Sequence, residues 1–197
     1  RSSLETTFSE LTPDTISIAV TALEEFSNVG KRSGYDYAGI SMKIAKVFER
    51  ELTIRIFRTW RSVSIEKFGK NVIKSIIEQP INELTDADRT LSDYFSKRSK
   101  TSLGGMRFAL RAITDEVKSS SITENFRNFV FSLNDPDWIL SDEFSSILND
   151  ISSKYRNGGV HEHIVDFVTC EDAVSRILTG KNNALNKLIM ATRQNAD

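Results

Sequence analysis

The feature that most constrains the fold of this chain is a stretch at positions 36–60 with apolar side chains at helical spacing. It reads DYAGISMKIAKVFERELTIRIFRTW. One stripe consists of Ile40, Ile44, Val47, Phe48 and either Glu51 or Leu52, and further apolar residues widen the stripe toward Trp60. A helix that is apolar over so much of its circumference is typical of the central helix of a bundle.

Further helices are predicted from apolar periodicity and capping residues. They lie at 11–30, 65–80, 91–97, 102–117, 120–133, 140–159, 169–180 and 183–194, with Gly69 interrupting the second of them. We expect caps at Thr12, Asp36, Ser102 and Ser141, and a capping box formed by Thr169 with Asp172. The residues NDPDW at 134–138 predict a turn, and only HIVDFVT at 163–169 suggests extended structure.

The sequence therefore predicts an all-α fold, with a helix bundle as its architecture. Residues 1–35 are expected to form an N-terminal helix or a linker from an upstream domain, and residues 36–197 the main helical domain. The chain begins with Arg1, so we expect a piece of a longer protein.

Charge and composition exclude several classes of protein. The net charge of −1 argues against a protein that coats nucleic acid without specificity, although a local basic patch stays open. One cysteine, Cys170, is incompatible with an internal disulfide framework and suggests a reducing, cytoplasmic setting. No stretch approaches the roughly 18 apolar residues of a membrane span, and no signal-peptide pattern is present, so no membrane association is expected.

Both histidines of the chain lie in the stretch KYRNGGVHEHIV, at His161 and His163. A His-x-His pair can bind a metal, but no cysteine or carboxylate cluster completes a ligand set here. We therefore expect neither a metal nor a cofactor. The chain also lacks a Walker-type loop, a dinucleotide-binding glycine pattern and a nucleophile elbow.

Arg156, Asn157 and His161 follow the pattern R-N-x-x-x-H at a predicted helix end. This pattern resembles the R-x4-6-H motif of the HEPN superfamily, in which Asn often follows the Arg. Three further stretches are similar to HEPN helices, namely DYAGISMKIAKVFERELTIRIF, TSLGGMRFAL and CEDAVSRIL. The resemblance covers about residues 36–179.

The resemblance implies a compact helical bundle that forms a homodimer. Many HEPN domains are metal-independent endoribonucleases that act as toxins or effectors in toxin–antitoxin pairs, CRISPR systems and antiviral defence, with a composite site between two subunits. Others have lost activity and serve as dimerisation or sensor modules. The resemblance assigns catalysis to Arg156 and His161, with Asn157 in support, RNA as the substrate, and a regulatory domain or antitoxin as a further partner.

The chemistry of these residues agrees with that assignment. Cleavage of RNA by its own 2′-hydroxyl needs proton transfer near neutral pH, for which histidine is suited. A guanidinium can hold the developing phosphorane charge through two hydrogen bonds. On an ideal helix Arg156 and His161 would point about 140° apart, so Gly158 and Gly159 would have to turn the chain. The alternative is an ordinary helix exit, with Asn157 as its cap and Arg156 facing the negative helix end.

A basic band accompanies the motif. Residues 43–74 contain nine Lys and Arg against three Glu, a local charge of +6. This band predicts RNA binding by Lys43, Lys46 and Arg50, and we add Lys154 beside the motif. The alternative is a solvated helix face with pairs such as Glu51 and Arg55. Glu49 lies in the apolar stripe, and we expect it to be a buried partner of Arg156.

Overall fold

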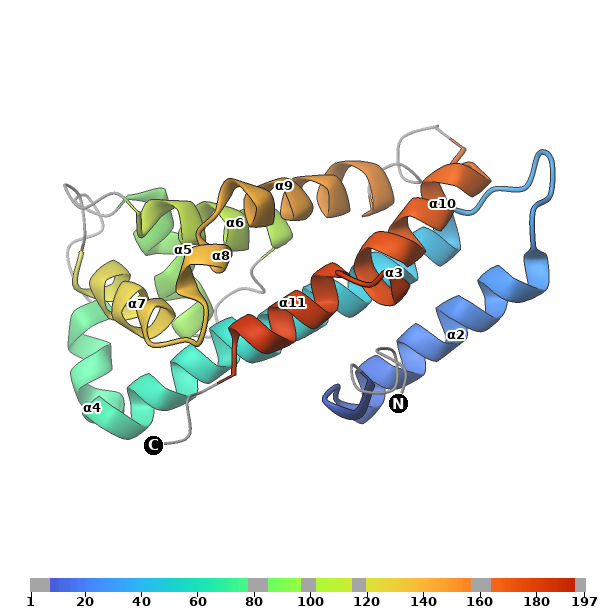
Figure 1. Cartoon of the computed structure of the whole chain (residues 1–197). Coiled ribbons are helices and arrows are strands. Elements are labelled where there is room, and N and C mark those ends of the chain that lie inside the picture. Colours follow the sequence, from blue (N-terminus) through green and yellow to red (C-terminus); the bar gives the residue numbers. More distant parts are fainter. Residues whose placement is uncertain (1–7, 78–84, 97–101, 115–119, 157–163, 194–197) are drawn as a thin grey trace. The chain divides into compact units, whose positions relative to one another are not determined.

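The structure is a computed structural model, and it describes residues 8–77, 85–96, 102–114, 120–156 and 164–193, with the backbone alone for 70–77. Over these ranges all regular structure is helical and no strand is present, which confirms the all-α prediction (Figure 1). The chain divides into two compact units. The first contains Arg1–Thr53 and Ser146–Met190, and the second contains Ile54–Ser145 and Ala191–Asp197.

The first unit is built around helix α3 (Ala38–Leu52). Helix α2 (Pro13–Val29), the π-helix η4 (Ile151–Arg156), helix α10 (Phe167–Ala173) and the π-helix η5 (Val174–Thr179) all contact α3. Helix α11 (Ala184–Ala191) follows, and all but its last residue belong to this unit. The stripe predicted from the sequence is buried along α3, including Ile44, Val47, Phe48 and Leu52. The expectation of a central helix is therefore confirmed.

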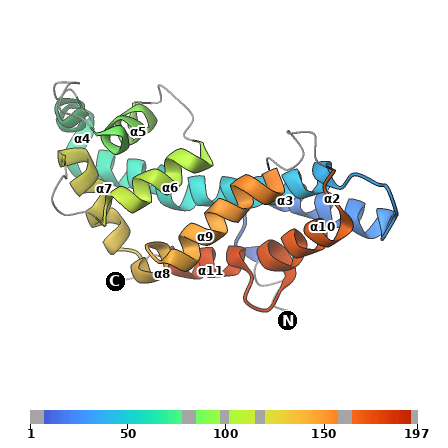
Figure 2. The same cartoon turned by 90° about the horizontal axis from the view of Figure 1, so that it is seen from above.

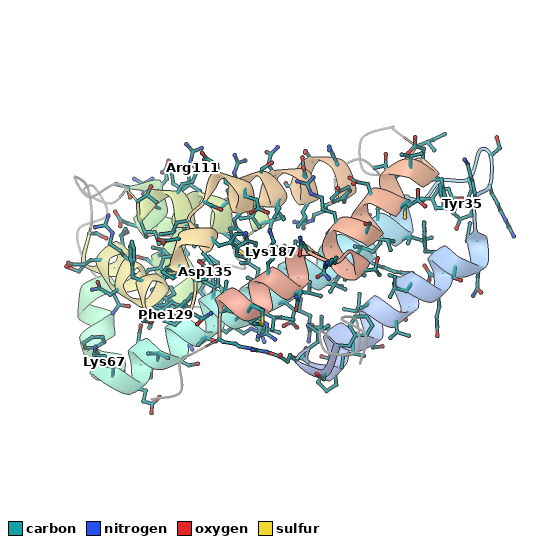
Figure 3. The ribbon with its side chains drawn as sticks, viewed as in Figure 1. Tyr35, Lys67, Arg111, Phe129, Asp135 and Lys187 are labelled. Atoms are coloured by element: carbon teal, nitrogen blue, oxygen red, sulfur yellow. The ribbon has the colours of Figure 1, made fainter. Side chains whose placement is uncertain are left out.

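The start of α3 is bound to the segment that precedes α10. The N–H of Tyr37 donates to the carbonyl of Val165 at 2.9 Å. The carboxylate of Asp36 accepts from the N–H of Ala38 at 3.0 Å and from the N–H of Val165 at 3.1 Å. The prediction of Asp36 as the cap of α3 was wrong by one position, because the N-cap is Tyr37; the carboxylate of Asp36 instead ties the first helical N–H to the segment before α10. Figure 3 shows Tyr35 in the connection between α2 and α3. The rings of Tyr35 and Tyr37 pack edge to face, with their centroids 4.8 Å apart.

The ends of three elements differ from the sequence prediction. The predicted cap of α10 was misplaced. The N-cap is Asp166, whose carboxylate accepts from the N–H of Thr169 in the first turn of the helix. Consequently the described part of HIVDFVT enters a helix and forms no strand. The predicted turn at 134–138 contains a short helix, α8 (Pro136–Ile139), capped by Asp135.

The second unit contains α4 (Thr59–Ile77), α5 (Asp86–Phe95), α6 (Leu103–Ala112), α7 (Ser121–Phe131) and α8. Helix α5 contacts α6 and α7, and α7 contacts α4 (Figure 2). The rings of Phe57, Trp60 and Phe126 form its core, with Trp60 and Phe126 4.9 Å apart. Gly69 interrupts α4 with φ 74°, as the sequence predicts, because an L side chain rarely adopts this conformation.

Two elements join or cross the units along the chain. The π-helix η1 (Thr53–Arg58) follows α3 directly and leads into α4, and α9 (Asp142–Asp150) leads into η4. The single helix predicted at 36–60 is thus an α-helix, a π-helix and the start of another α-helix. The predicted domain boundary after residue 35 stays a prediction; within the first unit, α2 packs against α3. None of the described helices is long and apolar enough to cross a membrane.

A buried carboxylate holds together two helices of the second unit. One oxygen of Asp88 accepts from the hydroxyls of Ser120 and Thr123 at the start of α7. The other oxygen accepts from the N–H of Thr85 at 2.9 Å and from the Thr85 hydroxyl at 2.7 Å. Thr85 and Asp88 together form the capping box of α5. Burial alone would raise the pKa of Asp88, but these hydrogen bonds outweigh it and lower the pKa below 3.8.

We predict that Asp88→Asn lowers the free energy of unfolding by about 1.5–3 kcal/mol at pH 7. One carboxylate oxygen becomes an NH₂ group that faces the two donors of Thr85 and cannot accept from them. Because the folded pKa is lowered, the wild-type advantage is present above pH 3.8 and is lost as the pH falls through the folded value. Urea unfolding at pH 7 and pH 3 measures both effects.

Asp86→Asn is the matched control for Asp88→Asn. Its carboxylate is exposed and lies 3.7 Å from Arg89, so its loss is expected to change stability by less than about 0.5 kcal/mol. Equal effects of the two variants would contradict the account of Asp88.

Candidate functional site

The candidate site begins at the π-helix η4, which ends at Arg156. In a π-helix the hydrogen bonds join residues five apart, and such turns occur often at functional sites. The sequence predicted one regular α-helix over 140–159, and this was wrong for its last turn. The rotation of about 140° between Arg156 and His161, which assumes ideal α-helical geometry, therefore does not apply here.

Two interactions fasten η4 and the end of α9 to the C-terminal helices. The buried Tyr155 donates its O–H to the carboxylate of Asp172 in α10, and Arg176 in η5 donates to Asp150. Burial and the negative charge of Asp172 raise the pKa of the Tyr155 phenol, so it remains a donor at neutral pH. The residue directly before Arg156 is thus fixed in place.

Arg156 itself is paired with Glu49 on α3. Its Nη1 donates to the Oε1 of Glu49 at 3.3 Å, across 107 positions of sequence. The expected contact between these residues is therefore confirmed, but Glu49 is partly exposed rather than buried, with 23% of its side chain accessible. The Arg156 side chain is 42% exposed.

The pair leaves most of the guanidinium unoccupied. Arg156 has five N–H donors, and within the described part of the chain only the contact with Glu49 engages it. A single ion-pair contact fixes the direction of the side chain and leaves a second edge that can bind a phosphate through two hydrogen bonds. This arrangement can hold an anion at the surface of the first unit.

The other motif residues lie outside the described residues. These are Asn157 and His161, together with Gly158, Gly159 and His163. The described residues on both sides of this segment are bound to α3 or to its start. Arg156 contacts Glu49 in the last turns of α3, and Val165 contacts Asp36 and Tyr37 just before the helix begins. Tyr37 and Glu49 lie about 18 Å apart along α3 at 1.5 Å per residue.

The predicted RNA-binding cations differ in how they are engaged. Lys43 pairs with Glu25 and Arg50 pairs with Asp14 at 2.6 Å, so α2 carries the counter-charges for α3. Lys154 lies 3.7 Å from Asp150 one turn away. Lys46 is exposed, and none of the described acidic residues pairs with it. It lies three residues before Glu49, on the same face of α3.

Two further cations of the basic band, Arg58 and Arg61, have internal partners. The Nε of Arg61 donates to the carbonyl of Phe95 at 2.8 Å, and Arg58 interacts with Tyr94. Glu51, named with Arg55 as an example of a solvated pair, is buried. Lys46 and Arg156 are therefore the two cations around Glu49 that remain available to an external anion.

Sequence reasoning identified Arg156 and Glu49 but not what holds η4. The contact between Tyr155 and Asp172 gives no local signal in the sequence, because the two residues are 17 positions apart and on different helices.

Among the described residues no group of three His, Cys, Asp or Glu side chains is placed to hold a metal ion. No family model matches the chain, and neither the curated proteins nor the solved structures contain a match.

We predict a coupling free energy of about 0.5–1 kcal/mol between Glu49 and Arg156. The estimate is kept low because both side chains are partly exposed and solvent screens their charges. A double-mutant cycle with Glu49→Gln and Arg156→Gln, measured by urea unfolding, gives this value. The exposed pair of Asp86 and Arg89 serves as the reference and is expected to show coupling near zero. Equal coupling in the two cycles would mean that Glu49 does not hold Arg156.

Proposed function

We propose that the chain is a metal-independent endoribonuclease of the HEPN type, a toxin or effector in bacterial defence or stress response. In this proposal two copies form a composite site at a homodimer interface. Arg156 binds the phosphate that is attacked, His161 transfers the proton, and Asn157 supports them. An unrestrained ribonuclease is toxic, so a regulatory domain or an antitoxin is expected as a partner.

The observation that supports this proposal best is the state of Arg156. One N–H is held by Glu49, no other contact of the guanidinium is present among the described residues, and 42% of the side chain is exposed. Lys46, which has no acidic partner among the described residues, lies on the same face of α3 as Glu49. A pre-oriented guanidinium with a free edge stabilises the charge of a phosphorane more effectively than a mobile one, because its orientation requires no reorganisation. A simple helix exit would not require a partner for Arg156 on another helix.

The second candidate is a HEPN-like module without catalysis that serves as a dimerisation or sensor module of a larger protein. The charge pattern favours it, because Lys43, Arg50 and Lys154 each face a carboxylate of the same chain. Cations that are already paired add little to the attraction of an RNA backbone. An inactive module would need no such attraction.

The test is the incubation of single-stranded RNA with the protein in the presence of EDTA. The wild type is expected to cleave, and His161→Ala is expected to lower the rate by about 10²–10⁴-fold, the usual contribution of general acid–base catalysis. Arg156→Ala is expected to lower it by about 10²–10³-fold, the usual effect of removing a donor that stabilises charge in the transition state. His163→Ala is the matched control and is expected to retain activity within a few-fold.

Two results would contradict the ribonuclease proposal. One is cleavage that EDTA abolishes, and the other is cleavage that His161→Ala leaves intact. A wild type that cleaves no RNA but sediments as a dimer supports the module without catalysis.

A further inference from the structure

A second surface of the first unit lies between η4 and α10, and of the residues assigned to RNA cleavage or RNA binding only Lys154 borders it. A hollow of about 490 Å³ is present here. Its lining contains three apolar side chains and four polar ones, namely Ile164, Val165 and Val168 and Ser153, Lys154, Thr169 and Asp172. Of the polar residues, Asp172 is fastened by Tyr155, so this wall of the hollow is fixed.

Two of the apolar side chains that line the hollow are unusually exposed to solvent. Ile164 is 69% exposed and Val168 is 63% exposed, the highest values among the large hydrophobic side chains in the described part of the chain. Single exposed apolar residues are common on protein surfaces. Two that lie side by side at the edge of a hollow form a contact site, because a partner can bury both of them together.

The charged residues that line the hollow are one cation, Lys154, and one carboxylate, Asp172. The neighbouring positions of α9, α10 and η5 add the carboxylates of Asp150, Asp166 and Glu171 and the cation of Arg176, so the whole set carries a charge of −2. Both cations are engaged with Asp150, at 3.7 Å in the case of Lys154. Glu171 and Asp172 are exposed and follow Val168 by three and four residues, so they lie on the same face of α10.

This pattern identifies the chemistry of the occupant. A nucleic acid would bring phosphates against the exposed carboxylates of Glu171 and Asp172 and is disfavoured. A second copy of the same surface would bring these like charges together across a two-fold axis. A segment with apolar side chains on one face and Lys or Arg beside them matches both the apolar residues and the carboxylates.

We infer that the hollow between η4 and α10 is a docking site for a basic amphipathic helix of a protein partner. The apolar residues of the partner cover Ile164 and Val168, and its cations face Glu171 and Asp172. Ile164, Val168, Glu171 and Asp172 have no role in the proposed RNA cleavage. The occupant would lie against η4, the π-helix that ends at Arg156.

The probe is a labelled synthetic helix with leucines at positions i, i+4 and i+7 and lysines elsewhere, measured by fluorescence anisotropy. We expect saturable binding that weakens as salt increases. Ile164→Gln and Val168→Gln are expected to weaken it at least tenfold, and Glu171→Lys several-fold. Phe131→Gln is the matched control, because Phe131 is 53% exposed on the second unit and should have no effect.

Several outcomes would overturn the inference. They are equal binding of a peptide with scrambled leucines, equal binding of a peptide with glutamates in place of lysines, and unchanged affinity in Val168→Gln. A wild type that self-associates through this face, with Val168→Gln monomeric in sedimentation, would assign the site to a second copy instead. Labelled RNA that loses affinity in Val168→Gln would assign it to nucleic acid.

Discussion

The structure of the first unit depends on how completely α3 is surrounded. Helices α2, α10, η4 and η5 all contact it, and its apolar stripe is fully buried. A polar side chain on such a helix must find a partner at the edge of the packed surface, because a desolvated charge without one is costly. Glu49 finds Arg156 there, and this single contact sets where the motif arginine points.

The same packing explains why the chain has a basic band but few available cations. Helix α2 places Asp14 and Glu25 against Arg50 and Lys43, so the charges of α3 are largely balanced within the unit. Near Glu49, the cations without another acidic partner among the described residues are Lys46, three residues earlier on α3, and Arg156, which contacts Glu49 itself. Two cations are too few to attract a long stretch of nucleic-acid backbone, in agreement with the net charge of −1.

The sequence predicted the elements that depend on local patterns. The apolar stripe of α3, the proline and glycine that bound α2, and the serine caps Ser102 of α6 and Ser141 of α9 all follow from spacing and propensity. The pairing of Glu49 with Arg156 could also be predicted from the sequence, because a carboxylate within an apolar stripe requires a cation as its partner.

Features that depend on tertiary contacts were not predicted. The π-helices η1, η4 and η5 have no recognisable composition, so the spacing of apolar residues did not distinguish them from the α-helices that precede them. Asp166 replaced Thr169 as the cap of α10 because Asp36 and Tyr37 hold Val165 in an extended approach to the helix. Asn157 and His161 lie outside the described residues, so their part of the site stays a prediction.

The central claim is that Glu49 fixes the orientation of Arg156 in solution. Side-chain NMR of ¹⁵N-labelled arginine measures rotation about the Nε–Cζ bond of each guanidinium. The account predicts slow rotation and separate Nη signals for Arg156 in the wild type, and averaged signals like those of the exposed Arg89 once Glu49 is replaced by Gln. Averaged Arg156 signals in the wild type, or signals that Glu49→Gln leaves unchanged, would contradict it.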